Sequence, residues 1–187
     1  MNVYDFDDTI LRGDSTARFY TYCLLRAPKM WLRAPGQIVN AILFLLKKRP
    51  KQEFKEKMFS FVTCLPDIDR TIEEFWDKNE SRVKAWYAET QRPDDVVISA
   101  SPEFLIKPIC KRLGITCAMA SPVDRHTGKY FGLNCHGAEK VRRFYEAFPE
   151  GEIDDFYSDS YSDDPLAQIS KRAFLVKGDQ LLPWEKK

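Results

Sequence analysis

The sequence predicts an α/β fold in which a mostly parallel sheet carries helices on both faces and an all-helical segment follows the first strand. Short continuous apolar runs, typical of strands buried on both faces, occur at residues 1–6 and again after residue 95. From there onward, strand patterns alternate with helical patterns, as in parallel sheets. Residues 14–87 contain no convincing strand, so they are interpreted as an insertion in a chain of 187 residues.

The insertion is expected to form four helices, because prolines disfavour helical backbone in the residues before them. These prolines are Pro28, Pro35, Pro50 and Pro66. The expected helices lie near residues 14–26, 36–48, 51–63 and 67–88. We therefore predict two units: a core formed by residues 1–13 and 89–187, and a helical cap formed by residues 14–88.

The elements after the insertion are predicted from apolar runs and from the proline, glycine and polar residues that bound them. A helix is expected with Ser101 as N-cap, Pro102 in its first turn and Gly114 at its end. A hairpin is expected around Thr127 and Gly128. The remaining expectations are strands at residues 96–98, 115–121, 152–160 and 172–177, and a helix at residues 137–148.

Charge is unevenly distributed along the chain. The net charge is +1, which gives no sign of a nucleic-acid partner. Residues 17–52 nevertheless carry eight basic residues and no acidic one, so the rest of the chain sums to −7. This asymmetry indicates a segment that meets something anionic. The basic residues are Arg18, Arg26, Lys29, Arg33, Lys47, Lys48, Arg49 and Lys51.

The five cysteines are an odd number without a C-x-x-C pair, which is typical of reduced thiols in a cytoplasmic protein. We also expect no leader-like segment before the first strand. Residues 38–46, IVNAILFLL, are too short to span a bilayer, which needs roughly 20 apolar residues. Flanked by basic residues, they would either lie in the interface of an anionic membrane at its inner face or form the core of the cap.

Polar side chains stand where the predicted strands end. Asp5 and Asp7 follow the first strand, Ser99 follows the second, and Asp159 with Asp163 follows a later one. Ligands of open α/β sheets bind beyond the carboxyl ends of the strands. Because neighbouring carboxylates repel each other, a cation is expected among them, and oxygen-only ligands favour Mg²⁺.

These residues resemble the motifs of the haloacid dehalogenase superfamily, which has a Rossmann-like fold. DFDDT (residues 5–9) resembles its D-x-D-x-T signature, and Ser99 in VVISAS its second motif. Lys140 in CHGAEKV resembles the third-motif lysine, and DSYSD (residues 159–163) the fourth motif. The helical insertion after the first motif resembles the phosphoserine phosphatase branch, subclass IB. The third and fourth motifs and the basic cap most resemble the phosphatidylglycerophosphatase C family.

The resemblance implies a Mg²⁺-dependent phosphomonoesterase that works through an aspartyl-phosphate. Asp5 would be the nucleophile and Asp7 the general acid and base. Phosphate contacts would come from Thr9, Ser99, Ala100 and Lys140, with Thr9 also orienting the first loop. Magnesium would be held by Asp5, the backbone carbonyl of Asp7, Asp159 and Asp163.

Several alternatives stay open. The substrate would be either a lipid phosphate or a small soluble one such as phosphoserine. Residues 54–65 offer lysines but no arginine to hold a substrate carboxylate, which weakens the second. A non-catalytic protein, or transfer to an acceptor other than water, is a further alternative, and the oligomeric state is not indicated. Asp14 would either cap a helix or contact a substrate amine. No metal or catalytic role is expected for Asp8, His126, His136, Asp154, Asp155 and Asp164.

Overall fold

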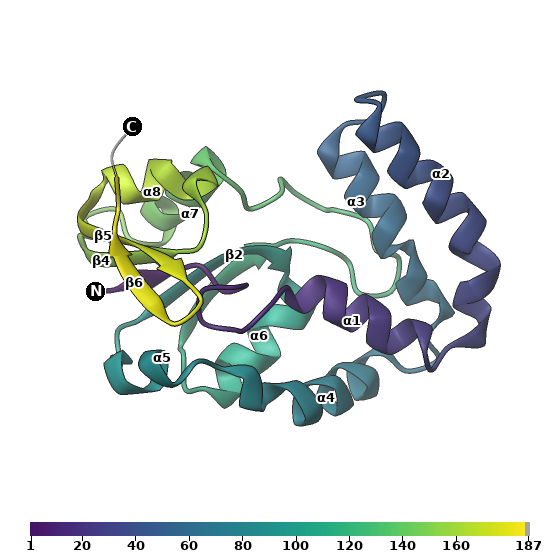
Figure 1. Ribbon diagram of the computed structural model, residues 1–187, viewed down its shortest axis with the longest axis horizontal. Coiled ribbons are helices and arrows are strands. Elements are labelled where there is room, and N and C mark those ends of the chain that lie inside the picture. Colours follow the sequence, from purple (N-terminus) through teal and green to yellow (C-terminus); the bar gives the residue numbers. More distant parts are fainter. Residues whose placement is uncertain (186–187) are drawn as a thin grey trace.

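The computed structural model describes residues 1–185, apart from the side chains of Ala34 and Lys51. Residues 186–187 of the predicted core, and the basic side chain of Lys51, therefore lie outside the described part. Within it, six strands form one sheet in the order β3-β2-β1-β4-β5-β6 (Figure 1). All neighbouring strands are parallel except β5 and β6. The strands are β1 (Val3–Tyr4), β2 (Val96–Pro102), β3 (Cys117–Ser121), β4 (Ile153–Ser158), β5 (Ser170–Lys177) and β6 (Gln180–Pro183).

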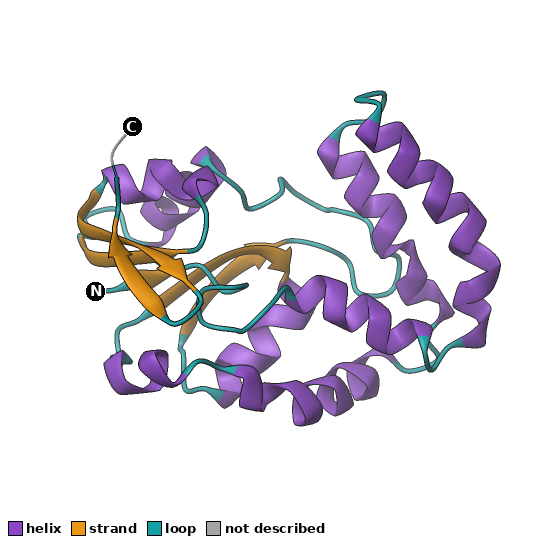
Figure 2. Cartoon of the chain, viewed as in Figure 1, coloured by secondary structure: helices purple, strands orange, loops and turns teal. Residues whose placement is uncertain are grey.

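Helices cover both faces of the sheet, as the sequence predicts (Figure 2). Side chains of a strand alternate between faces, so Val3 and Tyr4 belong to different apolar clusters. The cluster of Val3 includes Phe144 of α7 (Ala138–Ala147) and Leu166 of α8 (Asp164–Gln168). The cluster of Tyr4 includes residues of α5 (Ala85–Thr90) and α6 (Glu103–Arg112). The α/β fold class is therefore confirmed.

The insertion is helical, with boundaries that differ from those expected. Its helices are α1 (Ser15–Leu24), α2 (Ala34–Leu45), α3 (Lys51–Phe59) and α4 (Ile68–Asn79). Short 3₁₀ segments occur at Pro28–Arg33, Ser60–Cys64 and Glu80–Arg82. A single helix over residues 67–88 was the wrong expectation, because the chain there turns back to the first loop. Val83 forms an antiparallel bridge with Leu11, and this bridge separates α4 from α5.

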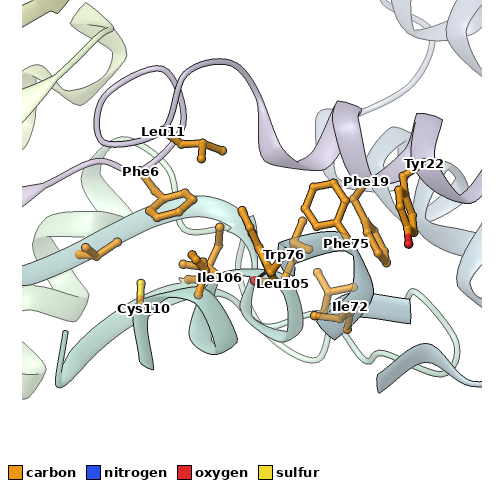
Figure 3. Close-up of a cluster of buried hydrophobic side chains, with 14 of the residues drawn as sticks. Phe6, Leu11, Phe19, Tyr22, Ile72, Phe75, Trp76, Leu105, Ile106 and Cys110 are labelled. Carbon is orange, nitrogen blue, oxygen red and sulfur yellow. Dashed lines mark hydrogen bonds between the residues drawn. The ribbon is translucent and has the colours of Figure 1, made fainter. Parts of the chain in front are cut away.

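Two helices of the insertion share the main apolar core. Phe19 of α1 and Phe75 and Trp76 of α4 pack in the cluster that also holds Phe6 and the α6 side chains (Figure 3). The Trp76 indole donates a 2.9 Å hydrogen bond to the carbonyl of Leu105 in α6. Helices α2 and α3 form a hairpin that projects from the rest of the molecule (Figure 1), and Phe59 at the end of α3 belongs to the same cluster. The division at residues 13/14 and 88/89 stays a prediction.

Other sequence expectations are corrected by tertiary contacts. Ser101 is not an N-cap: it lies in β2, and α6 begins one residue beyond Pro102. The expected hairpin around Gly128 is a turn with a single bridge, Val123 to Tyr130. The sequence did not indicate β6, which pairs with β5 at the edge of the sheet. The short helix α8 was also not expected.

Two further observations bear on the environment of the protein. In residues 1–185, no helix is long and apolar enough to cross a membrane. All five cysteines are free thiols, as their odd number indicates. The predicted cytoplasmic location stays a prediction.

Candidate active site

The predicted site residues meet at the carboxyl edge of the sheet because β2, β1 and β4 are neighbours. There they line a cavity of about 520 Å³ that α1 and α3 close from the side of the insertion. The strand order changes direction at β1, which is where open α/β sheets bind ligands. The cavity residues from the predicted set are Asp5, Asp7, Ser99, Ala100, Lys140, Asp159 and Asp163.

A buried lysine joins two carboxylates at the bottom of the cavity. Lys140 Nζ donates to Asp5 Oδ1 at 2.8 Å and to Asp163 Oδ2 at 2.7 Å. The lysine side chain is only 2% exposed. Burial alone would lower the pKa of Lys140, but the charges of Asp5 and Asp163 outweigh burial and raise it. Lys140 is therefore a fixed cation, held at the N-terminal end of α7.

Burial also changes the pKa of Asp5. It raises the pKa of Asp5 to about 7; Lys140 opposes this effect and the nearby charge of Asp163 adds to it. Asp163 Oδ2 accepts a second hydrogen bond from Ser158 Oγ at 2.9 Å. Asp163 Oδ1 is buried and has no hydrogen-bond partner. This part of the site carries more negative charge than Lys140 alone offsets.

Asp7 has separate partners. Its Oδ1 accepts from the backbone N–H of Ser15 at 2.6 Å, and its Oδ2 accepts from the hydroxyl of Ser101. The Ser101 hydroxyl also contacts Thr16 Oγ1 at 2.9 Å. Burial raises the pKa of Asp7 to about 6, and the charge of Asp14 contributes. An acid with such a pKa exchanges protons readily near neutral pH.

The segment after β2 forms the next wall of the cavity. Ser99 Oγ accepts from the backbone N–H of Ser101 at 3.1 Å and is almost fully buried. The Ala100 carbonyl accepts from Lys55 Nζ of α3 at 3.1 Å, and Lys55 also donates to Asn134 Oδ1 at 3.0 Å. The insertion thus places a lysine beside the segment predicted to hold phosphate.

Thr9 and Asp159 link the first motif to the fourth. Thr9 is fully buried, and its hydroxyl accepts from the backbone N–H of Asp159 at 2.9 Å. Thr9 is not among the residues that line the cavity. Its contacts therefore match the expected orienting part, while a direct phosphate contact stays a prediction. Burial raises the pKa of Asp159, and the charges of Asp8 and Asp163 add to this effect.

The chemistry of these residues fits a magnesium ion, although no ligand cluster is preformed. In residues 1–185, no three side chains of Asp, Glu, His or Cys are grouped so that they could hold a metal ion. Mg²⁺ keeps several waters and takes one or two carboxylates, so it does not need such a group. Among the described residues, six aspartates line the cavity against two lysines. The unpartnered Asp163 Oδ1 is a further buried oxygen that a cation would satisfy.

Sequence reasoning missed several residues of the cavity. Ser101 had been assigned to a helix cap, although its position two residues after Ser99 on one strand places both on the same side. Lys55 and the apolar side chains of the cavity had no sequence signal, because they come from α1, α3 and the 3₁₀ segment Ser60–Cys64 of the insertion. These apolar side chains are Ala17, Tyr20, Phe54, Met58, Phe59 and Phe61.

The structure also places Asp14, whose role was left open, and the residues expected to have no metal or catalytic role. Asp14 caps α1, since its Oδ1 accepts from the backbone N–H of Ala17 at 2.8 Å. His136 and Asp8 do line the cavity, whereas His126 is exposed and lies outside it. Three aspartates form hydrogen bonds outside the cavity: Asp154 with Lys171, Asp155 with Arg172, and Asp164 with Trp184.

The chain shares this architecture and part of its sequence with known proteins. It is 38% identical over 94 residues to a probable phosphatase of Mycobacterium tuberculosis, covering 46% of this chain and 33% of that one. It is 32% identical over 106 residues to a histidinol-phosphatase of Neisseria meningitidis, covering 50% of this chain and 48% of that one. The matched regions thus span a third to a half of these relatives.

Solved structures share the fold at low identity. A protein of unknown function from Bordetella pertussis superimposes with a TM-score of 0.76 at 18% identity, over 94% of this chain and 88% of that one. A phosphoserine phosphohydrolase-like protein from Francisella tularensis superimposes with a TM-score of 0.58 at 14% identity, over 94% of this chain and 87% of that one. The family model of haloacid dehalogenase-like hydrolases matches residues 3–168, which include all four motifs. The chain belongs to the haloacid dehalogenase-like hydrolases.

Proposed function

We propose that this protein is a Mg²⁺-dependent phosphomonoesterase that acts through an aspartyl-phosphate. One observation carries the proposal: Asp5 and Asp163 share the buried ammonium of Lys140, while Asp7 lines the same cavity with a raised pKa. These groups supply a nucleophile, a fixed positive charge and a proton donor in one cavity. Two relatives that share sequence with this chain are named as phosphatases.

The reaction proceeds in two displacements. Asp5 attacks phosphorus, the ester P–O bond breaks, and the leaving alkoxide takes the proton of Asp7. Asp7, now a carboxylate, accepts a proton from water as the water attacks the aspartyl-phosphate. The bond between phosphorus and Asp5 then breaks, and inorganic phosphate leaves. Both aspartates return to their starting protonation states.

The remaining cavity residues stabilise charge during these steps. Lys140 offsets the negative charge that builds up on Asp5 and the transferring phosphoryl group. Ser99 and the backbone of Ala100 hold phosphoryl oxygens, and Thr9 fixes the loop of Asp159. Asp5, the Asp7 carbonyl, Asp159 and Asp163 are the residues that would hold Mg²⁺. The ion would neutralise phosphate charge and orient the phosphoryl group.

The wall contributed by α1 and α3 bears on the substrate. Tyr20, Phe54 and Met58 make this wall largely apolar, which favours a phosphomonoester whose alcohol carries an apolar group, such as phosphatidylglycerophosphate. Asp14 is engaged as a helix cap, which weakens recognition of a substrate amine. Lys55 in the same wall would contact a second anionic group of the substrate.

The second candidate is a phosphatase of a small soluble monoester such as phosphoserine. The phosphoserine phosphohydrolase-like fold neighbour and the relative named histidinol-phosphatase favour it. Less favoured are a non-catalytic protein and a phosphotransferase to an acceptor other than water. Asp5, Asp7, Ser99, Lys140, Asp159 and Asp163 all line one cavity, which supports the catalytic alternative over the non-catalytic one.

A phosphate-release screen tests the proposal. Lipid and soluble phosphomonoesters are compared with Mg²⁺, with and without detergent, for the wild type and Asp5→Asn. We expect the amide variant to lose at least a thousandfold in kcat, since it cannot attack phosphorus, while its thermal unfolding stays near that of the wild type. Substantial turnover by Asp5→Asn would contradict the mechanism. Preference for a soluble ester would select the second candidate.

A further inference from the structure

Helix α2 exposes a broad apolar face. Its opposite side packs on α3: Asn40 donates to the carbonyl of Phe54 at 3.0 Å, and Phe44 stacks on the Phe54 ring at 4.4 Å. At 100° per residue, the exposed apolar positions span about 120° of the helix circumference. We call these residues the α2 face: Ile38, Val39, Ile42, Leu45 and Leu46, with exposures of 49–78%.

The 3₁₀ segment before α2 also exposes apolar side chains. Trp31 is 59% exposed and Leu32 is 84% exposed. Single exposed apolar residues are ordinary on a protein surface, but a concentration of this kind marks an interaction site. From the sequence, residues 38–46 could have formed the core of the cap. The structure shows that most of their apolar surface is exposed rather than buried in that core.

Basic side chains stand at both ends of the α2 face. Lys29 and Arg33 precede it, and Lys47 and Lys48 follow it; all four are exposed. Arg49, in contrast, is largely buried and engaged by Asn40 and Glu53. No acidic residue occurs between residues 17 and 52. The surface is therefore apolar in the middle and positive at its ends.

This distribution selects among possible partners. In an α2-to-α2 contact between two copies, whether parallel or antiparallel, basic ends would meet basic ends and repel. An anionic bilayer complements both properties, since acyl chains accept the apolar side chains and head groups attract the lysines and arginine. Helix α2 lies at the outer edge of the molecule (Figure 1), where it packs on α3 and accepts a 2.7 Å hydrogen bond at Gln37 from Tyr20 of α1.

We propose that the α2 face, with Trp31 and Leu32, inserts into the interface of an anionic membrane while the four flanking cations contact its head groups. The docked helix would lie one helix away from the active-site cavity, about 10 Å at usual packing distances. Phe54 connects the two, because it stacks on Phe44 of α2 and also lines the cavity. The idea that docking gives the enzyme access to a lipid substrate rests on the proposed function. The docking itself is independent of that function.

Vesicle binding tests the proposal without relying on activity. The wild type is mixed with vesicles of phosphatidylglycerol and phosphatidylcholine, or of phosphatidylcholine alone, at low and high salt. We expect co-sedimentation with the anionic vesicles and at least tenfold weaker binding to the neutral ones. Trp31 serves as a reporter: its emission should shift to the blue on binding and be quenched by brominated lipids. Trp31→Phe should remove most of this signal.

Two double variants separate the apolar and charged contributions. Lys47→Glu/Lys48→Glu should weaken binding at least tenfold at low salt and much less at high salt, because salt screens charges. Ile42→Ser/Leu45→Ser should weaken it at both salt concentrations. The matched controls are Lys107→Glu/Lys111→Glu and Leu181→Ser/Leu182→Ser, which change the same residue types elsewhere. All four variants should hydrolyse soluble p-nitrophenyl phosphate as the wild type does.

Three outcomes would overturn the proposal. The first is absence of wild-type binding to anionic vesicles at low salt. The second is equal loss of binding in the control variants, which would mean nonspecific adsorption. The third is a dimer in sedimentation velocity that Ile42→Ser/Leu45→Ser dissociates, which would assign the face to a second copy. Vesicle binding by a protein that hydrolyses no phosphomonoester would instead contradict the proposed function and leave the docking surface intact.

Discussion

At the scale of single residues, the site assigns different surroundings to two aspartates that are two positions apart. Asp5 faces a fixed ammonium, whereas Asp7 receives an N–H and a hydroxyl. In both cases the partners oppose burial: Lys140 lowers the pKa of Asp5, and the hydrogen bonds from Ser15 and Ser101 lower that of Asp7, while burial raises both. Ser101 is central to the second environment, since it connects Asp7 to Thr16 of α1.

We therefore predict that Ser101→Ala lowers kcat about tenfold and changes KM little. The hydroxyl orients Asp7 for proton transfer, and the loss of one positioned hydrogen bond typically has an effect of this size. Steady-state kinetics with a soluble ester measures it. Ser162→Ala is the control, because Ser162 lines the same cavity and its hydroxyl bonds to Ser160 rather than to Asp7. A fall in kcat of the same size in both variants would count against the assignment.

Asp95 gives a prediction on stability and pH. The side chain is buried, one of its oxygens has no hydrogen-bond partner, and burial raises its pKa to about 6. Because the folded-state pKa lies above the unfolded value, the folded state binds the proton more tightly. The stability contributed by protonated Asp95 is complete below about pH 4 and is lost as pH rises through about 6.

Asp95→Asn removes the buried charge and should stabilise the protein by about 1–2 kcal/mol at pH 7.5, with the difference shrinking towards pH 4. Its oxygen can still accept from the backbone N–H of Arg92, as Asp95 does at 2.8 Å. Urea unfolding at several pH values measures the effect. The neighbouring, half-exposed Asp94 offers the control Asp94→Asn. A destabilised Asp95→Asn at pH 7.5 would mean that the charge is needed.

At the scale of elements, the segment between β3 and α7 packs against α3 of the insertion. The backbone N–H of Tyr130 donates to Glu56 at 3.3 Å, and Lys55 bonds to Asn134. Gly128 approaches most closely: a Cβ there would lie 2.4 Å from the carbonyl oxygen of Phe59. Its φ of +74° also favours glycine.

Gly128→Ala should therefore destabilise the protein by roughly 2–3 kcal/mol, through backbone strain and through displacement of α3. Gly114→Ala isolates the strain, because Gly114 has the same φ of +74° and open space around the added Cβ. The control should cost about 1 kcal/mol. Urea unfolding of both variants measures the difference. Equal losses would show that the contact with Phe59 is loose.

At the scale of the whole molecule, one cavity collects charge from distant parts of the chain. Its carboxylates follow β1 and β4, its cations belong to α3 and α7, and its apolar wall belongs to α1 and α3. Within the described residues, this cavity has more aspartates than lysines. We expect the excess negative charge to be offset by a divalent cation.

Chelation of divalent ions should abolish phosphate release, and Mg²⁺ should restore it. Ca²⁺ should inhibit, because its larger and less regular coordination shell displaces the phosphoryl group from Asp5. Asp159→Ala should raise the Mg²⁺ concentration for half-maximal activity at least tenfold. Asp164→Ala is the control, since Asp164 lies close in sequence but bonds to Trp184 and Gln168 outside the cavity. Full activity in chelator would contradict the magnesium proposal.

The sequence alone predicted the fold class and brought the motif residues together. Buried parallel strands require continuous apolar runs, and residues that follow such strands must gather at one edge of the sheet. This reasoning placed Asp5, Asp7, Ser99, Asp159 and Asp163 around one cavity, as the structure has them, whereas Lys140 of α7 was expected there from the family resemblance. Local sequence patterns sufficed for this prediction, because consecutive residues show where a buried strand begins and where it ends.

Tertiary structure decided what depends on partners distant in sequence. Ser101 had a plausible local reading as a helix cap, but its hydroxyl bonds to Asp7, 94 positions away. The edge strand β6 forms because β5 offers it an antiparallel partner. The apolar run at residues 38–46 was equally compatible with burial and with exposure. Only the packing of Asn40 and Phe44 on α3 determined which side of α2 is covered, because a helix cannot specify by its own periodicity which neighbour will cover it.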